Sequence, residues 1–151
     1  MPADLVALAS DHAGYELKVL LKDELESMGL AVLDLGTDSL ASVDYPDFGF
    51  LAGQAIASGK ASRGVIVCGS GIGISIAANR VPEARAALCH DGLTARLARQ
   101  HNDANILAIG SRTTGIETAR DMVRIFMSTP FEGGRHAGRV AKLTKGPVTA
   151  S

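Results

Sequence analysis

The segment most typical of catalysis in this chain is a cysteine followed at once by a glycine-rich turn. Cys68 ends the apolar run 65–67 and precedes Gly69-Ser70-Gly71-Ile72-Gly73. Glycines let a backbone turn sharply and point its N–H groups at a ligand. The run 72–79 is expected to form a helix, whose N-terminal dipole favours a thiolate or an oxyanion in the turn. The pattern indicates a nucleophile or base beside an anion site, while a tight turn with an inert, buried thiol fits the same residues.

Three better-known motifs do not fit this turn. A P-loop needs a Lys in its glycine-rich sequence, and the turn has none. A dinucleotide-binding fingerprint follows the first strand with the spacing G-x-G-x-x-G, whereas this turn follows the third predicted strand. A phosphatase with a catalytic thiol would carry Arg six residues after the cysteine, where this chain has Ile74. The turn therefore predicts none of these three activities.

Two histidines stand beside other polar residues. Asp11-His12 follows the first apolar run. Asp11 suits either the capping of the next helix or the orientation of His12 as an acid, base or anion contact. His101, followed by Asn102, ends a helical stretch, where the helix dipole favours a histidine without any catalytic role. The four histidines include no i, i+4 pair with a third ligand, so we predict no metal site.

Positive charge gathers near the end of the chain. Arg135, His136 and Arg139 follow Gly133-Gly134. Arginine forks bind phosphate oxygens in pairs, and neighbouring glycine N–H groups can add to such a site. The cluster indicates a phosphate site, with a solvated basic tail as the alternative interpretation.

Composition limits the classes of protein to which the chain can belong. Its 151 residues are 46% hydrophobic, so we expect one domain over 1–151 with a real core. A net charge of −1 and 4% aromatic residues argue against a nucleic-acid or membrane-surface partner. We expect no signal peptide, no membrane span, a cytoplasmic location and no disulfide between Cys68 and Cys89.

Short apolar runs alternate with amphipathic stretches along the chain. Strands are predicted at 5–9, 31–34, 64–68, 84–89 and 106–109. Helices are predicted at 17–28, 46–58, 72–79, from 92 and at 116–126, with a short last helix at 139–143 after an irregular segment, 130–138. This alternation implies a parallel sheet with helices on both faces. Ligands of such sheets bind at the carboxyl ends of the strands, where Asp11, Cys68 and Arg112 fall.

These motifs together resemble one family, the type B ribose-5-phosphate isomerases with the related galactose- and allose-6-phosphate isomerases. The matching stretches are Ser10-Asp11-His12-Ala13-Gly14, Asp44-Tyr45-Pro46, 68–75, 77–80, 99–105, Gly110-Ser111-Arg112 and 131–136. The resemblance implies a Rossmann-like three-layer α/β/α sandwich with a five-stranded parallel sheet. It also implies a sugar-phosphate isomerase that needs no metal or cofactor and works as a homodimer or tetramer.

The resemblance further implies a role for each matching residue. Cys68 would move a proton between C1 and C2 of the sugar, and His101, with Asp11, would open the furanose ring. Ser70, Gly69, Gly71 and Gly73 would stabilise the enediolate. The phosphate would be held by His12, Arg112, Arg135 and Arg139, while Tyr45 and Asn102 would line the site. Some relatives use a carboxylate base a few residues after the cysteine position, but this chain has Ile74 and Ser75 there.

Two questions stay open at this point. The resembling enzymes act on five-carbon or on six-carbon sugar phosphates, so the resemblance does not identify which of them is the substrate of this chain. A sugar-phosphate binding module on the same fold, with a merely structural thiol, is the alternative to an enzyme. In the resembling family the loop that carries Cys68 faces His101 of the partner subunit, so we expect active sites shared between two chains.

Overall fold

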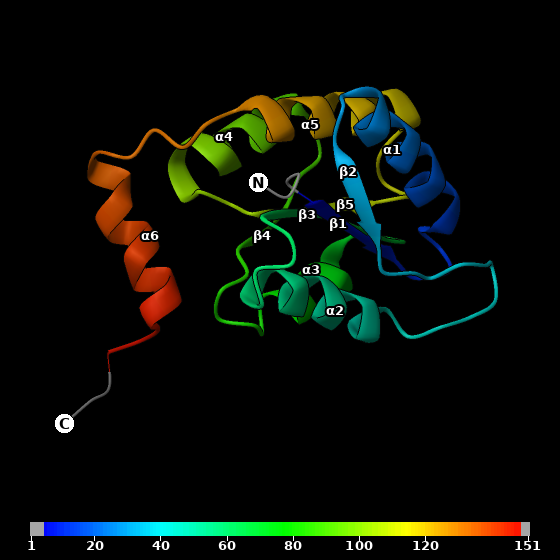
Figure 1. Ribbon diagram of the computed structural model, residues 1–151, viewed down its shortest axis with the longest axis horizontal. Helices are drawn as coiled ribbons and strands as arrows, with labels where there is room; N and C mark the ends of the chain where they lie inside the picture. Colours follow the sequence, from blue (N-terminus) through cyan, green and yellow to red (C-terminus); the bar gives the residue numbers. More distant parts are fainter. Residues whose placement is uncertain (1–4, 149–151) are drawn as a thin grey trace.

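The computed structural model describes residues 5–148, which form three layers around one parallel sheet (Figure 1). The strand order is β2-β1-β3-β5-β4. The strands are β1 (Leu5–Ser10), β2 (Ala31–Asp34), β3 (Arg63–Cys68), β4 (Ala86–Leu88) and β5 (Ile106–Gly110). The helices are α1 (Tyr15–Ser27), α2 (Tyr45–Ala57), α3 (Ile72–Ala78), α4 (Gly92–Asn102), α5 (Ile116–Ser128) and α6 (Arg135–Lys145). The predicted α/β/α sandwich with five parallel strands is confirmed.

The core lies on both faces of the sheet. Helices α1, α4 and α5 cover one face, and α2 and α3 cover the other (Figure 1). The central strand β3 is buried on both sides, as is typical of parallel sheets. Val65 and Val67 pack into the core under α1 and α5, whereas Ile66 and Cys68 pack into the core under α2 and α3. The thiol therefore leaves the sheet on the side of the helix that follows it, α3.

The three central strands, β1, β3 and β5, finish at nearly the same height along the strand direction. Cys68 of β3 pairs with Gly110 of β5, and Val67 pairs with Ser10 of β1. The Ser111 N–H, just past β5, donates to the Cys68 carbonyl at 2.9 Å. The loops that follow β1, β3 and β5 consequently meet above one edge of the sheet.

Two predicted boundaries were wrong. β4 covers three residues and not 84–89, because the Ala84 N–H is used by a turn to Val81 and the Asn79 side chain bonds both backbone groups of Ala86. The last helix starts at Arg135 and not at 139, so the irregular segment is shorter than predicted. Gly133 and Gly134 adopt φ angles of 69° and 55°, which closes a tight turn that starts α6 early.

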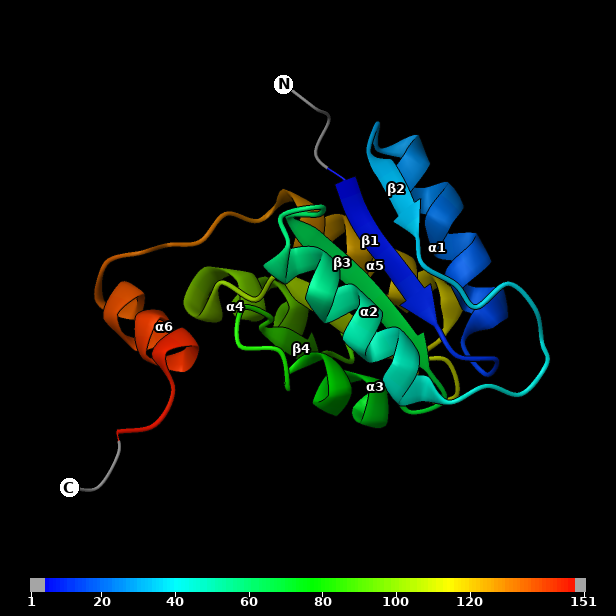
Figure 2. The same ribbon diagram turned by 60° about the horizontal axis from the view of Figure 1, so that its bottom comes forward.

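Helix α6 stands apart from the sheet and packs chiefly against α4 (Figure 2). Its buried residues are His136 and Val140, which lie one turn apart on the face toward α4. Among the described residues, no helix has the length and apolar character needed to cross a membrane. The position of α6 matters because the basic cluster predicted from the sequence lies on it.

Candidate active site

A pocket of about 690 Å³ opens at the carboxyl edge of the sheet. Eight of the residues predicted from the sequence line it together: Asp11, His12, Tyr45, Cys68, Gly69, Ser70, Gly73 and Arg112. The other lining residues are Ala13, Ile72, Ile76 and Thr113. The loops after β1, β3 and β5 and the start of α2 thus supply one continuous set of polar groups, as the topology predicts.

Cys68 lies at the floor of this pocket and is almost fully buried. Its Sγ accepts a hydrogen bond from the Gly71 N–H at 3.1 Å. Gly71 has a φ of 76°, and a Cβ there would lie 2.6 Å from Leu88 and 2.8 Å from the Ile109 backbone. Glycine is therefore required at position 71 for the turn to aim its N–H at the sulfur.

Two side chains pack over the glycine-rich turn. A Cβ at Gly73 would overlap the ring of Tyr45, and a Cβ at Gly69 would lie 3.2 Å from the Arg112 guanidinium. The Arg112 N–H donates to the Gly69 carbonyl at 2.9 Å, which fixes the backbone of the two loops relative to each other. An aromatic ring and an exposed positive charge thus lie over the two ends of the turn, at Gly73 and Gly69.

Asp11 closes the turn before α1, and the partner of His12 is a backbone N–H group and not Asp11. Asp11 Oδ1 accepts the Gly14 N–H at 3.0 Å, so the side chain closes the turn before α1 while it also lines the pocket. His12 Nδ1 accepts the Val43 N–H at 3.1 Å. An imidazole whose Nδ1 accepts a hydrogen bond carries its proton on Nε2, so His12 can donate Nε2–H to an anion in the pocket.

A second depression, of about 360 Å³, lies between α4 and α6. It is lined by His101, Asn102, His136, Arg139, Val140 and Leu143, and it shares no residue with the first pocket. Arg135 lies beside it, exposed at the start of α6. Within residues 5–148, neither Arg135 nor Arg139 forms an ion pair or side-chain hydrogen bond, so both guanidinium groups are available to a ligand.

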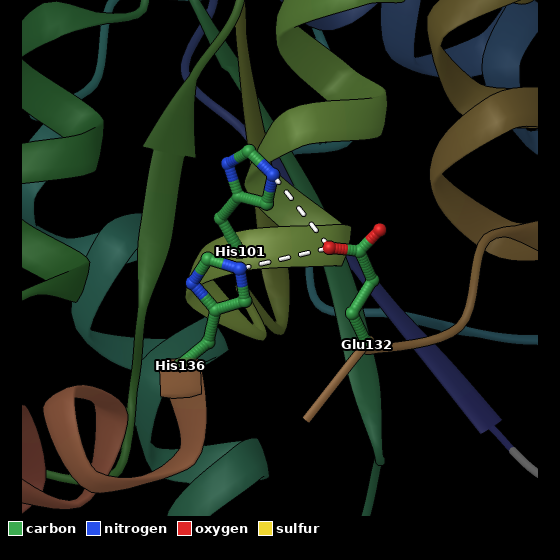
Figure 3. Close-up of side chains that lie close together, drawn as sticks. All are labelled: His101, Glu132 and His136. Atoms are coloured by element: carbon green, nitrogen blue, oxygen red, sulfur yellow. Dashed lines mark ion pairs between the residues drawn. The ribbon is translucent and has the colours of Figure 1, made fainter. Parts of the chain in front are cut away.

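Figure 3 shows a cluster at the rim of this second depression. The Nε2 atoms of His101 and His136 lie 3.7 and 3.6 Å from Glu132 Oε1. The two rings are stacked, with centroids 4.5 Å apart and planes 16° from parallel. Burial lowers the pKa of His136, and the positive charge of Arg135 lowers it further, against the opposing effect of Glu132. His136 is therefore neutral at neutral pH.

The same three side chains offer ligand atoms within 4.8 Å of one another. A shared metal ion would need the in-plane lone pairs of both imidazoles to converge on one point. Both stacked rings turn Nε2 toward Glu132 Oε1, so the carboxylate itself accounts for the observed contacts. The arrangement suits two imidazoles that share a carboxylate.

Topology explains why the predicted site residues fall into two groups. Cys68 ends a strand, whereas His101 lies at the end of α4, which runs back to the amino end of β5. Within one chain, Cys68 therefore lies at the carboxyl ends of the strands and His101 lies near their amino ends. From the sequence, His136 was placed only in the basic cluster predicted to bind phosphate and Glu132 was given no role, because their contact with His101 depends on how the turn before α6 folds.

The two cysteines are free and differ in their surroundings. Cys89 packs into the core under α4 and α5. Burial raises the pKa of the Cys89 thiol to about 11, with a smaller contribution from Asp91. Cys89 is therefore a protonated core residue at neutral pH, whereas Cys68 lines the first pocket.

Comparison with known proteins identifies the family. A model of the ribose/galactose isomerase family matches residues 6–143. The chain belongs to this family. The matched residues include Cys68 and the glycine-rich turn that follows it.

Individual relatives cover nearly the whole chain. It is 42% identical over 139 residues to ribose-5-phosphate isomerase B of Escherichia coli, covering 92% of this chain and 93% of that protein. It is 39% identical over 139 residues to D-erythrulose-4-phosphate isomerase of Pectobacterium atrosepticum, covering 91% of each. The solved structure of ribose-5-phosphate isomerase B of Clostridium thermocellum superposes with a TM-score of 0.92 at 49% identity, covering 93% of this chain and 95% of that one. Members of the family are isomerases, and so is this protein.

Proposed function

We propose that this isomerase interconverts ribose 5-phosphate and ribulose 5-phosphate through an enediolate, with Cys68 as the base. The observation that carries the proposal is the thiol at the floor of a polar pocket, with the Gly71 N–H donated to its sulfur. Such a donor stabilises negative charge on sulfur, and the thiolate is the form that removes a proton from carbon. The names of the relatives from E. coli and C. thermocellum support ribose 5-phosphate as the substrate.

The proposed reaction needs three things from the protein. A proton on C2 of an aldose is weakly acidic, so its removal requires a base and strong stabilisation of the resulting oxyanion. Cys68 supplies the base, and the turn from Gly69 to Gly73, with the Ser70 hydroxyl, supplies donors for the oxygens on C1 and C2. The third requirement is a binding site for the phosphate group, which provides binding energy away from the reacting carbons.

We also infer that each active site is shared between two chains of a homodimer, either alone or within a tetramer. The first pocket holds Cys68, Asp11, His12 and Arg112, whereas His101, which is assigned to ring opening with Asp11, and Arg139 lie in the other depression. The two lie at opposite edges of one sheet. A two-fold arrangement that sets the thiol pocket of one chain against the α4–α6 depression of its partner would complete both sites.

A panel of substrates tests the proposed function. We expect ribose 5-phosphate to give a higher kcat/KM than allose 6-phosphate, galactose 6-phosphate or D-erythrulose 4-phosphate, with full activity in the presence of EDTA. Preference for a six- or four-carbon phosphate would overturn the choice of substrate. Loss of activity on chelation, restored by a divalent ion, would overturn the metal-free mechanism. A non-catalytic binding module would saturate with ligand and form no product.

Replacing the arginines of α6 should weaken substrate binding before it affects chemistry. Arg135→Ala and Arg139→Ala each remove a guanidinium that has no carboxylate partner within residues 5–148. Loss of a charged hydrogen-bond donor to phosphate raises KM by about ten- to a hundredfold. Steady-state kinetics and inhibition by a phosphorylated substrate analogue measure the change, with Arg120→Ala on α5 as the matched control. Unchanged inhibition in both variants would contradict this role.

A further inference from the structure

We propose that Glu132 is a positioning residue that holds His101 in one tautomer for opening the sugar ring. This inference rests on the proposed function, because it assigns the proton-transfer step before enediolate formation to His101. It concerns a residue that the sequence analysis left without a role. Three observations carry it: the anchoring of Glu132, the direction of the two imidazoles and the charge around them.

Glu132 is anchored to the helix that carries His101. Its backbone N–H donates to the carbonyl of Gln100 at 3.1 Å, one residue before His101. Directly after Glu132, the turn at Gly133 and Gly134 starts α6, which brings the His136 side chain beside the Glu132 carboxylate. The segment before it is fixed as well, since the buried Arg99 donates Nε–H to the Thr129 carbonyl at 3.1 Å. The carboxylate is thereby placed beside both imidazoles.

The imidazoles point the same nitrogen at this carboxylate. Each ring turns Nε2 toward Glu132 Oε1 and Nδ1 away from it (Figure 3). At 3.7 Å the contact between His101 Nε2 and Glu132 Oε1 is electrostatic, and a negative oxygen attracts an N–H and repels a nitrogen lone pair, so it favours the tautomer of His101 that carries its proton on Nε2. Nδ1 is then left with a free lone pair. Glu132 would thus orient the imidazole of His101 in the way that the aspartate of a Ser-His-Asp triad orients its histidine.

The chemistry of ring opening uses that lone pair. The C1–O4 bond of the furanose breaks, the C1=O1 carbonyl forms, and one proton moves from O1 to O4. His101 Nδ1 accepts the O1 proton and returns it to O4, so the histidine ends as it began. Between these transfers the ring is an imidazolium, and the negative charge of Glu132, at 3.7 Å, stabilises it. The neutral, stacked His136 adds no opposing charge and keeps the ring in place.

An open-chain substrate separates this role from a structural one. Ribulose 5-phosphate cannot form a furanose, because its C5 hydroxyl carries the phosphate. Deuterium uptake at C1 of ribulose 5-phosphate in D₂O therefore needs the base at position 68 but no ring opening. Conversion of ribose 5-phosphate to ribulose 5-phosphate needs both, because the aldose enters the site as a furanose that must open before C2 can lose its proton. The ratio of the two initial rates, followed by proton NMR, reports on His101 alone.

We expect Glu132→Gln to slow the conversion of ribose 5-phosphate about tenfold while it changes C1 exchange less than about twofold. The loss is far smaller than in a buried triad because the Glu132 side chain is half exposed. Glu132→Asp, which keeps the carboxylate, should recover part of the rate. Glu117→Gln, an exposed glutamate on α5 paired with Arg120, is the matched control and should change neither rate.

A second measurement follows the tautomer directly. ¹⁵N NMR of the imidazoles, with His101 assigned by its loss in His101→Gln, should show Nε2 protonated in the unaltered protein and a mixture in Glu132→Gln. A parallel fall of exchange and isomerisation, or no change in either rate or tautomer, would overturn the role of Glu132. If the unaltered protein neither isomerises ribose 5-phosphate nor exchanges C1 of ribulose 5-phosphate, the proposed function fails instead, before any variant is compared.

Discussion

Cys68→Ala is expected to remove proton transfer between C1 and C2 while phosphate-ligand affinity stays largely intact. The thiol is the group at the floor of the pocket that can take a proton from carbon, and a positioned base is worth about 10²- to 10⁴-fold in rate. Its removal leaves His12 and Arg112 in place, so a phosphorylated inhibitor should bind with nearly unchanged affinity. Exchange of the C2 proton of ribose 5-phosphate with solvent measures the step directly.

The second cysteine provides the control for this prediction. Cys89 is a protonated core thiol whose pKa burial raises to about 11, so Cys89→Ala should leave proton exchange unchanged. Iodoacetamide at neutral pH should label Cys68 and not Cys89, inactivate the enzyme, and be slowed by a bound sugar phosphate. A Cys68→Ala protein that exchanges the C2 proton at the normal rate would rule out the thiol as the base.

Mixing two inactive proteins is expected to restore about a quarter of normal activity. In a shared site, Cys68 of one chain acts with His101 of the partner subunit. A dimer of one Cys68→Ala chain and one His101→Ala chain then holds one intact site and one doubly damaged site. Random pairing makes half of the dimers mixed, and half of their sites work, which gives the quarter.

Subunit exchange must be verified independently in this experiment. Native mass spectrometry of chains with different isotope labels shows whether mixed dimers have formed, and unaltered protein taken through the same steps gives the reference activity. If Cys68 and His101 of a site came from one chain, no mixed dimer could contain an intact site. Absence of recovery in a sample with confirmed mixed dimers would therefore refute the shared site.

Local patterns in the sequence were sufficient to predict the sheet and the first pocket. Apolar runs that are buried on both faces and alternate with amphipathic helices leave few topologies open, and parallel strands bring their carboxyl ends together. That rule is enough to place Cys68 beside Asp11 and Arg112. The edge strand was predicted too long because backbone groups of Ala86 are bonded by the Asn79 side chain, an interaction that depends on tertiary structure.

The depression between α4 and α6 was harder to predict because it depends on a turn. Gly133 and Gly134 were treated as part of a flexible segment, yet their positive φ angles start α6 and bring His136 back to Glu132. A glycine pair has many conformations in isolation, and the contact with α4 selects this one. The relation between His101 and Glu132 spans two elements that are distant in sequence, so no local pattern reveals it.

In the proposed dimer, the position of α6 would make substrate binding depend on the concentration of the enzyme. The helix has eleven residues, packs chiefly on α4, and leaves Leu143 60% exposed. A helix of this length is marginal in water without a surface to cover it. In the proposed dimer the partner chain would supply that surface, so subunit association and the ordering of this helix would be a single coupled event. On dilution, a chain that dissociates would lose the ordered helix that carries Arg135 and Arg139 together with the thiol of its partner. Substrate affinity and turnover would then decrease together.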